Sequence, residues 1–412
     1  MNWGVRWRLS AMMFLQYAIW GAWAPFLWTF LVGKNPGLGM ADWQAGIVFG
    51  MQALSCILAP FTGGQIADRW VSTEKFLGVV HILGGVMLFL TAKATNFTEI
   101  CVLFALYNLL YAPTLALTNS MAFHHIEDQR IFGQVRVLGT IGWICAAFML
   151  TAWRSMHLFP GVADCLMLPA GLSILMGILC FFLPHTPPAK EAKDPLAFRE
   201  AFVLLKDKNF LIFMLIAFVV TTELQFYYGP TEQFLQTAMK IPANLTPITL
   251  SVAQAAEFFA MAFLLSYALR KWGVRKTMAL GTIAWPLRYV IFALAPLGAL
   301  SVMRPLVIFS LTFHGIGYTL FFVASQVYVD MVSPKDIRAS TQSLLAFVTL
   351  GVGTWLGAQF TGIIKDYFHP ATNAANWTPF FLVPCALTVL CAIAFLAFFK
   401  DTKSEAKVGA AK

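Results

Sequence analysis

Two polar side chains interrupt the apolar stretch "TLSVAQAAEFFAMAFLLSY", residues 249–267. Gln254 and Glu257 are three positions apart, so a helix would place both on one face. A carboxylate at the centre of a bilayer costs about 2.5–3.5 kcal/mol on insertion scales, so we expect this face to turn away from lipid. An amide and a carboxyl there could hydrogen-bond a polar ligand, and the carboxyl could also bind and release a proton.

Three other apolar stretches carry polar and aromatic residues at helical spacing. They are Arg136, Thr140 and Trp143 in one stretch, Gln225 and Tyr228 in a second, and His314 and Tyr318 in a third. Rings that stack, together with several donors and acceptors, suit a ligand that has a flat ring and hydroxyl groups. We interpret these stripes as parts of one substrate site.

Each stripe also has a simpler interpretation. Thr140, Trp143 and Tyr228 are residue types that often only pack membrane helices together, and His314 could be a helix-packing histidine. Arg136 lies near a helix end and could extend its charge to the interface. Glu257 is the hardest to explain by packing, because its own stretch contains no lysine or arginine.

A second arginine within an apolar stretch is Arg288 in "AWPLRYVIF". It follows a proline and lies deeper than Arg136. We predict a structural ion pair between Arg288 and Glu223, since an arginine in a membrane helix needs a partner.

The composition indicates the elements that carry these side chains. Of the 412 residues, 59% are hydrophobic and only 11% are charged, and the mean hydropathy is +0.72. A soluble protein of this length would carry about 25% charged residues. We therefore predict an all-α polytopic membrane protein with twelve transmembrane helices. The predicted spans are 9–31, 43–67, 76–94, 98–122, 132–152, 164–183, 210–236, 248–270, 277–297, 304–326, 339–364 and 378–400.

The net charge of +9 is distributed unevenly between alternate loops. One side of the predicted membrane topology carries 20 lysines and arginines, and the other carries six. By the positive-inside rule, this bias places both termini in the cytoplasm. The charge thus reflects topology, and we do not expect nucleic acid as a partner.

The chain divides into two similar halves. Residues 184–208 contain prolines and alternating charges, typical of a cytoplasmic linker between an N-terminal half, 1–183, and a C-terminal half, 209–400. Trp70 and Trp272 lie in matching basic loops 202 positions apart, which indicates a duplication into pseudo-symmetric six-helix halves. Parallel repeats with a site at their interface are typical of secondary transporters. The tail, 401–412, is predicted to be disordered.

The loop "GGQIADRWVSTEK" resembles the loop signature of the major facilitator superfamily. The resemblance implies the major facilitator fold. It also implies a gating role for Asp68 and Arg69, in which the loop holds neighbouring helix ends through charge and helix-dipole contacts.

The chain as a whole resembles the bacterial nucleoside:proton symporters of that superfamily. The stretches that carry the resemblance are "FLQYAIWGAW", "YAPTLALTNS", "VRVLGTIGW", "LPHTPPAK", "TELQ", "SVAQAAE", "AWPLRYVIFA" and "DIRASTQ". The resemblance implies nucleoside uptake across the inner membrane, driven by a proton gradient. It places substrate-binding residues at Arg136, Thr140, Gln225, Gln254 and Glu257.

Other pocket positions depart from the family pattern. Trp143 and Tyr318 replace phenylalanine, Tyr228 replaces asparagine, and His314 replaces tyrosine. Thr319 stands where the family has an aspartate, which leaves Glu257 as the main expected proton-coupling residue. The substrate could be a purine nucleoside, a modified nucleoside or another ring-bearing sugar compound. An uncoupled facilitator or an exporter, in which Glu257 only hydrogen-bonds the ligand, is the main alternative.

Other classes of protein find little support in the sequence. It contains no nucleophile–base set, no phosphate-binding glycine loop and no cluster with metal-ligand spacing, so we expect neither an enzyme nor a cofactor other than the proton gradient. The seven cysteines lie within or at the ends of apolar stretches, as small apolar residues do. A non-transporting sensor is disfavoured by the latch-like loop, and we expect a monomer.

Overall fold

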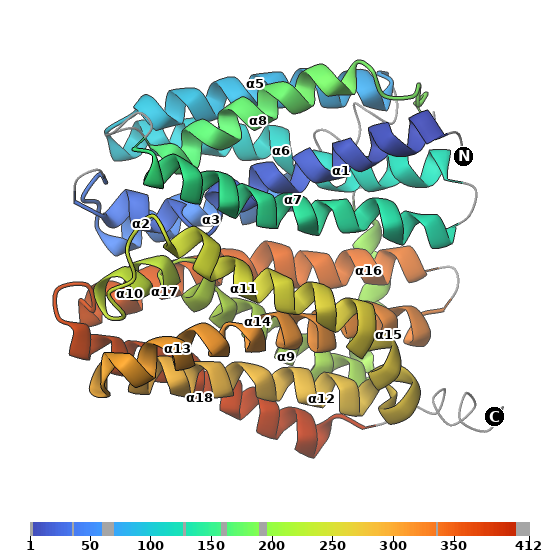
Figure 1. Cartoon of the computed structure of the whole chain (residues 1–412). Helices are drawn as coiled ribbons and strands as arrows, with labels where there is room; N and C mark the ends of the chain where they lie inside the picture. Colours follow the sequence, from blue (N-terminus) through green and yellow to red (C-terminus); the bar gives the residue numbers. More distant parts are fainter. Residues whose placement is uncertain are drawn as a thin grey trace. The chain divides into compact units, whose positions relative to one another are not determined.

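The computed structural model describes residues 3–34, 37–59, 70–126, 129–157, 163–188, 196–334 and 337–400 (Figure 1). Helix is the only regular secondary structure in these ranges, apart from an isolated bridge between Lys34 and Leu38. Eight continuous helical stretches there are long and apolar enough to cross a bilayer. Thr246–Leu297 has 52 residues, enough for two crossings, because 20 residues already span the hydrocarbon core. The predicted all-α polytopic fold is confirmed, and twelve spans are consistent with it.

The chain forms two compact units. The first comprises Met1–Asp194 with two short later segments, Tyr228–Glu232 and Ile241–Ile248. The second comprises Pro195–Tyr227, Gln233–Lys240 and Thr249–Lys412.

The first unit is a bundle of apolar helices. Its helices are α1 (Trp3–Trp23), α2 (Leu27–Val32), α3 (Asp42–Leu58), α5 (Thr73–Lys93), α6 (Phe97–His125), α7 (Gln129–Ser155) and α8 (Asp164–Cys180). Helix α1 packs along α7, α5 along α8, and α3 along α6. The side chain of Asn96 caps the start of α6 by accepting a hydrogen bond from the Glu99 amide at 2.8 Å.

The second unit has longer, more irregular helices. Its elements are η2 (Ala197–Lys206), α9 (Lys208–Tyr228), α10 (Thr231–Thr237), α11 (Thr246–Phe259), η3 (Ala260–Leu264), α12 (Leu265–Leu294), η4 (Ala295–Leu297), α13 (Leu300–Ser310), α14 (Thr312–Gly317), η5 (Tyr318–Val323), α15 (Ala324–Val332), α16 (Arg338–Ala346), η6 (Phe347–Gly353), α17 (Thr354–Phe368), η7 (Ala374–Asn376) and α18 (Trp377–Phe398). Helices α10 and α11 each begin with residues of the first unit and continue with residues of the second.

Local sequence explains where these helices break. Gly273 has φ +76°, a left-handed conformation that glycine adopts without strain, so α12 turns sharply within the predicted basic loop. Pro230 lies two residues beyond the end of α9 and cannot continue its hydrogen bonding. Three segments, η3, η5 and η6, have π-helical hydrogen bonding, a geometry that often marks functional positions.

An arginine network holds the later segments of the first unit against α7 and α8. Arg154 lies in the last turn of α7, with its Nε 2.6 Å from Asp164 and its Nη1 2.6 Å from the Oε1 atom of Glu232. Thr246 also donates to that Glu232 oxygen, at 2.8 Å. The Glu232 side chain is only 1% exposed, so Arg154 is its main charge compensation.

Candidate functional site

The predicted stripe on α7 meets aromatic rings of α1. The Arg136 guanidinium lies 3.9 Å from the ring centroid of Tyr17, a cation–π contact. The Trp143 ring lies 5.5 Å from that of Trp20, at an interplanar angle of 63°. The two helices therefore form a half-buried strip of rings and one positive charge, suited to a flat polar ligand.

Thr140 lies between Arg136 and Trp143 on α7, and all three are half-buried. The structure thus brings the three together within the first unit, while their role in binding stays a prediction.

The pair on α11 is held close to α14. Gln254 is buried and Glu257 is half-buried. Gly315 of α14 has no side chain, and a Cβ there would overlap the backbone nitrogen of Glu257 and the carbonyl of Ala253. Thr319 of η5 donates to the Glu257 carbonyl at 3.4 Å. Close helix approach at Gly315 therefore fixes the backbone that carries Glu257.

His314 is completely buried and its ring stacks on Tyr227, with centroids 4.2 Å apart. Its Nδ1 atom lies 2.9 Å from Nη1 of Arg288. A guanidinium can only donate, so Nδ1 must accept, which fixes His314 as the neutral tautomer with its proton on Nε2. Tyr318 lies one turn further along, 6.2 Å from the His314 ring.

Arg288 is also completely buried. Its guanidinium lies 4.3 Å from the Tyr227 ring and 4.4 Å from the Tyr289 ring. The expected ion pair with Glu223 is not direct: among the described residues, no contact within 4.0 Å joins the two charges. The two side chains do interact electrostatically at longer range. The hydrogen-bond partner of Arg288 is His314.

Gln225 and Tyr228 sit in different surroundings. Gln225 is buried and its Nε2 donates to the Thr221 carbonyl at 3.3 Å, beside Gly357 of α17. Tyr228 is half-buried at the end of α9 and belongs to the first unit. Asp68 and Arg69, the predicted gating pair, lie outside the described residues.

Several residues at these positions were missed by sequence reasoning. Tyr17 and Trp20 are one turn apart in α1, so their helical spacing was a usable signal. A buried network in the first unit was also missed: Gln16 donates to Thr114 at 2.7 Å, and its Oε1 lies 3.0 Å from Nε2 of His81. Polar groups so deeply buried and so fully bonded hold helices together.

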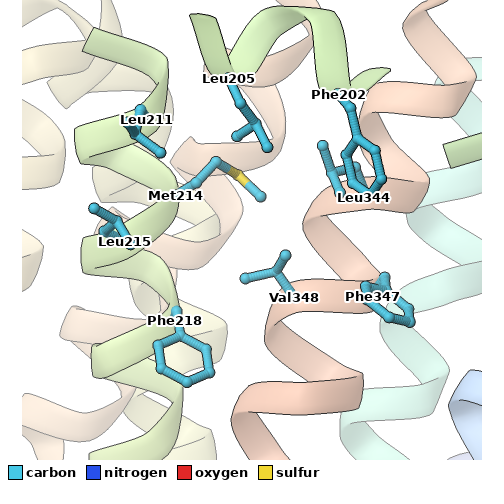
Figure 2. Close-up of a pocket in the computed structure, with 9 residues that line it drawn as sticks. All are labelled: Phe202, Leu205, Leu211, Met214, Leu215, Phe218, Leu344, Phe347 and Val348. Carbon is cyan, nitrogen blue, oxygen red and sulfur yellow. The ribbon is translucent and has the colours of Figure 1, made fainter. Parts of the chain in front are cut away.

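The second unit has an apolar cavity of about 200 Å³ between η2, α9, α16 and η6 (Figure 2). Its lining residues are Phe202, Leu205, Leu211, Met214, Leu215, Phe218, Leu344, Phe347 and Val348. These side chains cannot hydrogen-bond a hydroxyl or a base edge, so the cavity does not fit a nucleoside.

Metal binding finds no support in the described ranges, where no group of three or more His, Cys, Asp or Glu side chains could hold an ion. The charged and polar groups that are present instead suit reversible binding of an organic solute and of a proton.

Solved structures match this arrangement of helices. A crystal structure of the nucleoside transporter NupG aligns over 98% of this chain and 100% of its own, with TM-score 0.84 and 25% identity. A D-xylose–proton symporter aligns with TM-score 0.70 at 13% identity, which shows a shared fold alone. Fold and polar membrane helices together define a polytopic transporter of the major facilitator fold.

Sequence comparison gives the family. The profile described as nucleoside H⁺ symporter matches residues 3–404. The xanthosine permease of Escherichia coli (strain K12) is 28% identical, with 97% of each chain covered. YegT of the same strain, named only as a candidate nucleoside transporter, is 31% identical over 97% of this chain and 94% of its own. The chain belongs to the nucleoside H⁺ symporter family, as the sequence motifs predicted.

Proposed function

We propose that this protein takes up a nucleoside together with protons across a bacterial inner membrane. The observation that carries the proposal is the Gln254–Glu257 pair, an amide and a half-buried carboxyl on one apolar membrane helix of a nucleoside H⁺ symporter family member. A carboxyl in that place is costly unless it serves a ligand or an ion pathway.

The residues of the first unit suit the base of a nucleoside. Trp143, supported edge-on by Trp20, offers a ring face for stacking. Arg136 would donate to a base carbonyl, and its contact with the Tyr17 ring holds the guanidinium in place. Thr140 would add one hydroxyl between them. The resemblance of "VRVLGTIGW" to the family pattern supports the same assignment.

The residues of the second unit suit ribose hydroxyls and proton coupling. Gln254 and Glu257 would accept and donate hydrogen bonds to the sugar, and Gln225 would contribute a further amide. Glu257 would bind a proton from the outer side and release it inside. Coupling then requires that the protonated and substrate-bound forms favour different access states, since a ligand shifts an equilibrium only through differential affinity.

The departures from the family pattern bear on the choice of substrate. Tyr228 adds ring surface where the family has an asparagine, and His314, engaged with Arg288 through Nδ1, presents its Nε2 proton as a donor. We propose a substrate with a large base, such as a purine nucleoside. An uncoupled facilitator is the second candidate, favoured by Thr319, which offers a hydroxyl in place of a carboxyl.

The proposed orientation places both termini in the cytoplasm, supported by the excess of lysine and arginine on that side. The two six-helix halves, joined by the 184–208 linker, would rock to open the site alternately to either side. The lipid bilayer is the expected surrounding, a monomer is the expected functional unit, and the proton gradient is the expected energy source.

The test is uptake of radiolabelled adenosine, inosine and uridine into proteoliposomes, with and without an inward proton gradient. We expect one of them to accumulate only with the gradient in the wild type. Glu257→Gln should exchange labelled for unlabelled nucleoside without accumulating it. Uptake that is the same with and without the proton gradient would favour the facilitator. If none of the three nucleosides enters the vesicles or competes for uptake, the substrate class is refuted.

A further inference from the structure

A second carboxyl, that of Glu223, lies buried in the second unit. Glu223 is completely buried on α9, and neither of its carboxylate oxygens has a hydrogen-bond partner among the described residues. Its backbone carbonyl accepts a hydrogen bond from Tyr289 at 3.1 Å. A buried carboxylate in that condition is strongly destabilised unless it is protonated or compensated by a nearby charge.

The nearby charge is Arg288, which interacts with Glu223 at longer range. Arg288 also has unsatisfied atoms: its Nε and Nη2 find no hydrogen-bond partner in the described part of the chain. Its guanidinium stays charged at any physiological pH. The buried cluster of Glu223, Arg288 and His314 therefore contains one fixed positive charge.

His314 does not supply a proton site in this arrangement. Its Nδ1 accepts from Arg288 at 2.9 Å, and a proton on Nδ1 would face the guanidinium directly. Tyr289 interacts with Glu223 and with Arg288, and Cys385 and Cys391 of α18 also interact with Glu223. These phenol and thiol groups are neutral near pH 7.

Tyr227 connects this cluster to the proposed substrate site. Its ring lies 4.3 Å from the Arg288 guanidinium and stacks on His314, and the phenol interacts electrostatically with both Arg288 and Glu257. Tyr227 thus links Glu257 to the charges of Arg288 and Glu223. One bound proton makes the set electrically neutral, whereas none or two would leave a net charge in an apolar surrounding.

We propose that Glu223 and Glu257 share a single coupling proton, with Arg288 as their common counter-charge. This proposal rests on the proposed function and names a second group in its proton coupling. Binding of a nucleoside to the ionised Glu257 places the shared proton on Glu223. Release of the nucleoside and of the proton then go together.

The proton balance over one cycle is simple. Water on the outer side supplies one proton, which forms an O–H bond with one of the two carboxylates. That bond breaks when the site opens to the cytoplasm, and the proton returns to water there. The nucleoside is not altered, and one positive charge moves inward with it.

The experiment uses purified wild type, Glu223→Gln and Glu223→Asp in proteoliposomes, with Glu99→Gln, an exposed carboxyl on α6, as the matched control. An inward gradient of one pH unit supports about tenfold accumulation at one proton per nucleoside. We expect wild type and Glu99→Gln to approach that value. Glu223→Gln should exchange nucleoside at a wild-type rate without accumulation, and Glu223→Asp should accumulate with a shifted pH profile.

Accumulation by Glu223→Gln equal to wild type would overturn the proposal. The proposal would also be overturned if Glu223→Gln lost both exchange and accumulation while eluting like the wild type in size-exclusion chromatography. Glu223 would then serve substrate binding or structure. If Glu223→Gln does not fold, an unchanged pH profile in Glu223→Asp overturns the proposal and a shifted profile supports it. Wild type that carries no nucleoside would instead refute the proposed function.

Discussion

Replacing Arg154 by alanine should destabilise the first unit by more than any exposed ion pair could. Arg154 lies 2.6 Å from both Asp164 and Glu232, whose side chains are 16% and 1% exposed. Asp164 can turn to water after the substitution, but Glu232 would remain buried without the arginine charge, still accepting a hydrogen bond from Thr246. Removing one partner of a buried pair typically costs about 3–5 kcal/mol. Since Arg154 is itself 17% exposed, we expect the lower end, about 3 kcal/mol.

The assay is thermal unfolding of the purified protein in detergent. A loss of that size lowers the melting temperature by on the order of 10 °C in a unit of this length. Arg304→Ala is the matched control, because Arg304 donates to the backbone carbonyls of Met239, at 2.9 Å, and Lys240, and bonds to no carboxylate in the described part of the chain. It should lose about 1 kcal/mol.

A double substitution separates the cost of an orphaned charge from lost packing. Glu232→Gln in the Arg154→Ala background removes the uncompensated carboxylate, so it should recover much of the loss. Equal decreases in melting temperature for Arg154→Ala and Arg304→Ala would refute the reasoning. A double variant with a melting temperature no higher than that of Arg154→Ala would refute it as well.

Two further predictions concern the candidate site. Trp143→Ala should weaken nucleoside binding up to about tenfold, because an aromatic pair contributes about 0.5–1.5 kcal/mol beyond the burial of its surface area. Isothermal titration calorimetry measures the affinity, and Phe148→Ala, at an exposed position of the same helix, is the control. An unchanged affinity of Trp143→Ala would contradict the stacking role. Gly315→Ala should impair transport and lower the melting temperature, because the new Cβ would overlap the backbone of Glu257. Gly171→Ala should be neutral, because no atom lies within 4 Å of the Cβ position there. Equal transport and equal melting temperatures in the two variants would contradict the close approach of α14 to α11 at Gly315.

Hydropathy and composition were sufficient to predict the helices, since a bilayer imposes both their length and their apolar character. The stripe of Arg136, Thr140 and Trp143 was predictable for the same reason, because helical periodicity fixes which residues share a face. Packing between helices was not predictable in this way. Nothing local in the sequence says that Gly315 meets the backbone of Glu257.

The buried charges show this limit most clearly. Arg288 was expected to pair with Glu223, yet its direct partner is His314, contributed by a different helix. Tyr228 was selected from α9, whereas Tyr227, rotated by about 100° on the helix, faces that cluster. Lys365 is one of the six lysines and arginines that the charge bias assigns to the outer side, but it lies buried in α17, bonded to Gln233. These contacts join distant parts of the chain, and periodicity does not encode them.

Direct detection of proton movement tests the central claim most directly. Proteoliposomes in weakly buffered medium, with no imposed gradient, receive a nucleoside outside while a pH-sensitive dye reports the external pH. The account predicts that the medium becomes alkaline on addition of the nucleoside, in wild type but not in Glu257→Gln. Nucleoside entry into wild-type vesicles with no accompanying change in external pH would contradict it.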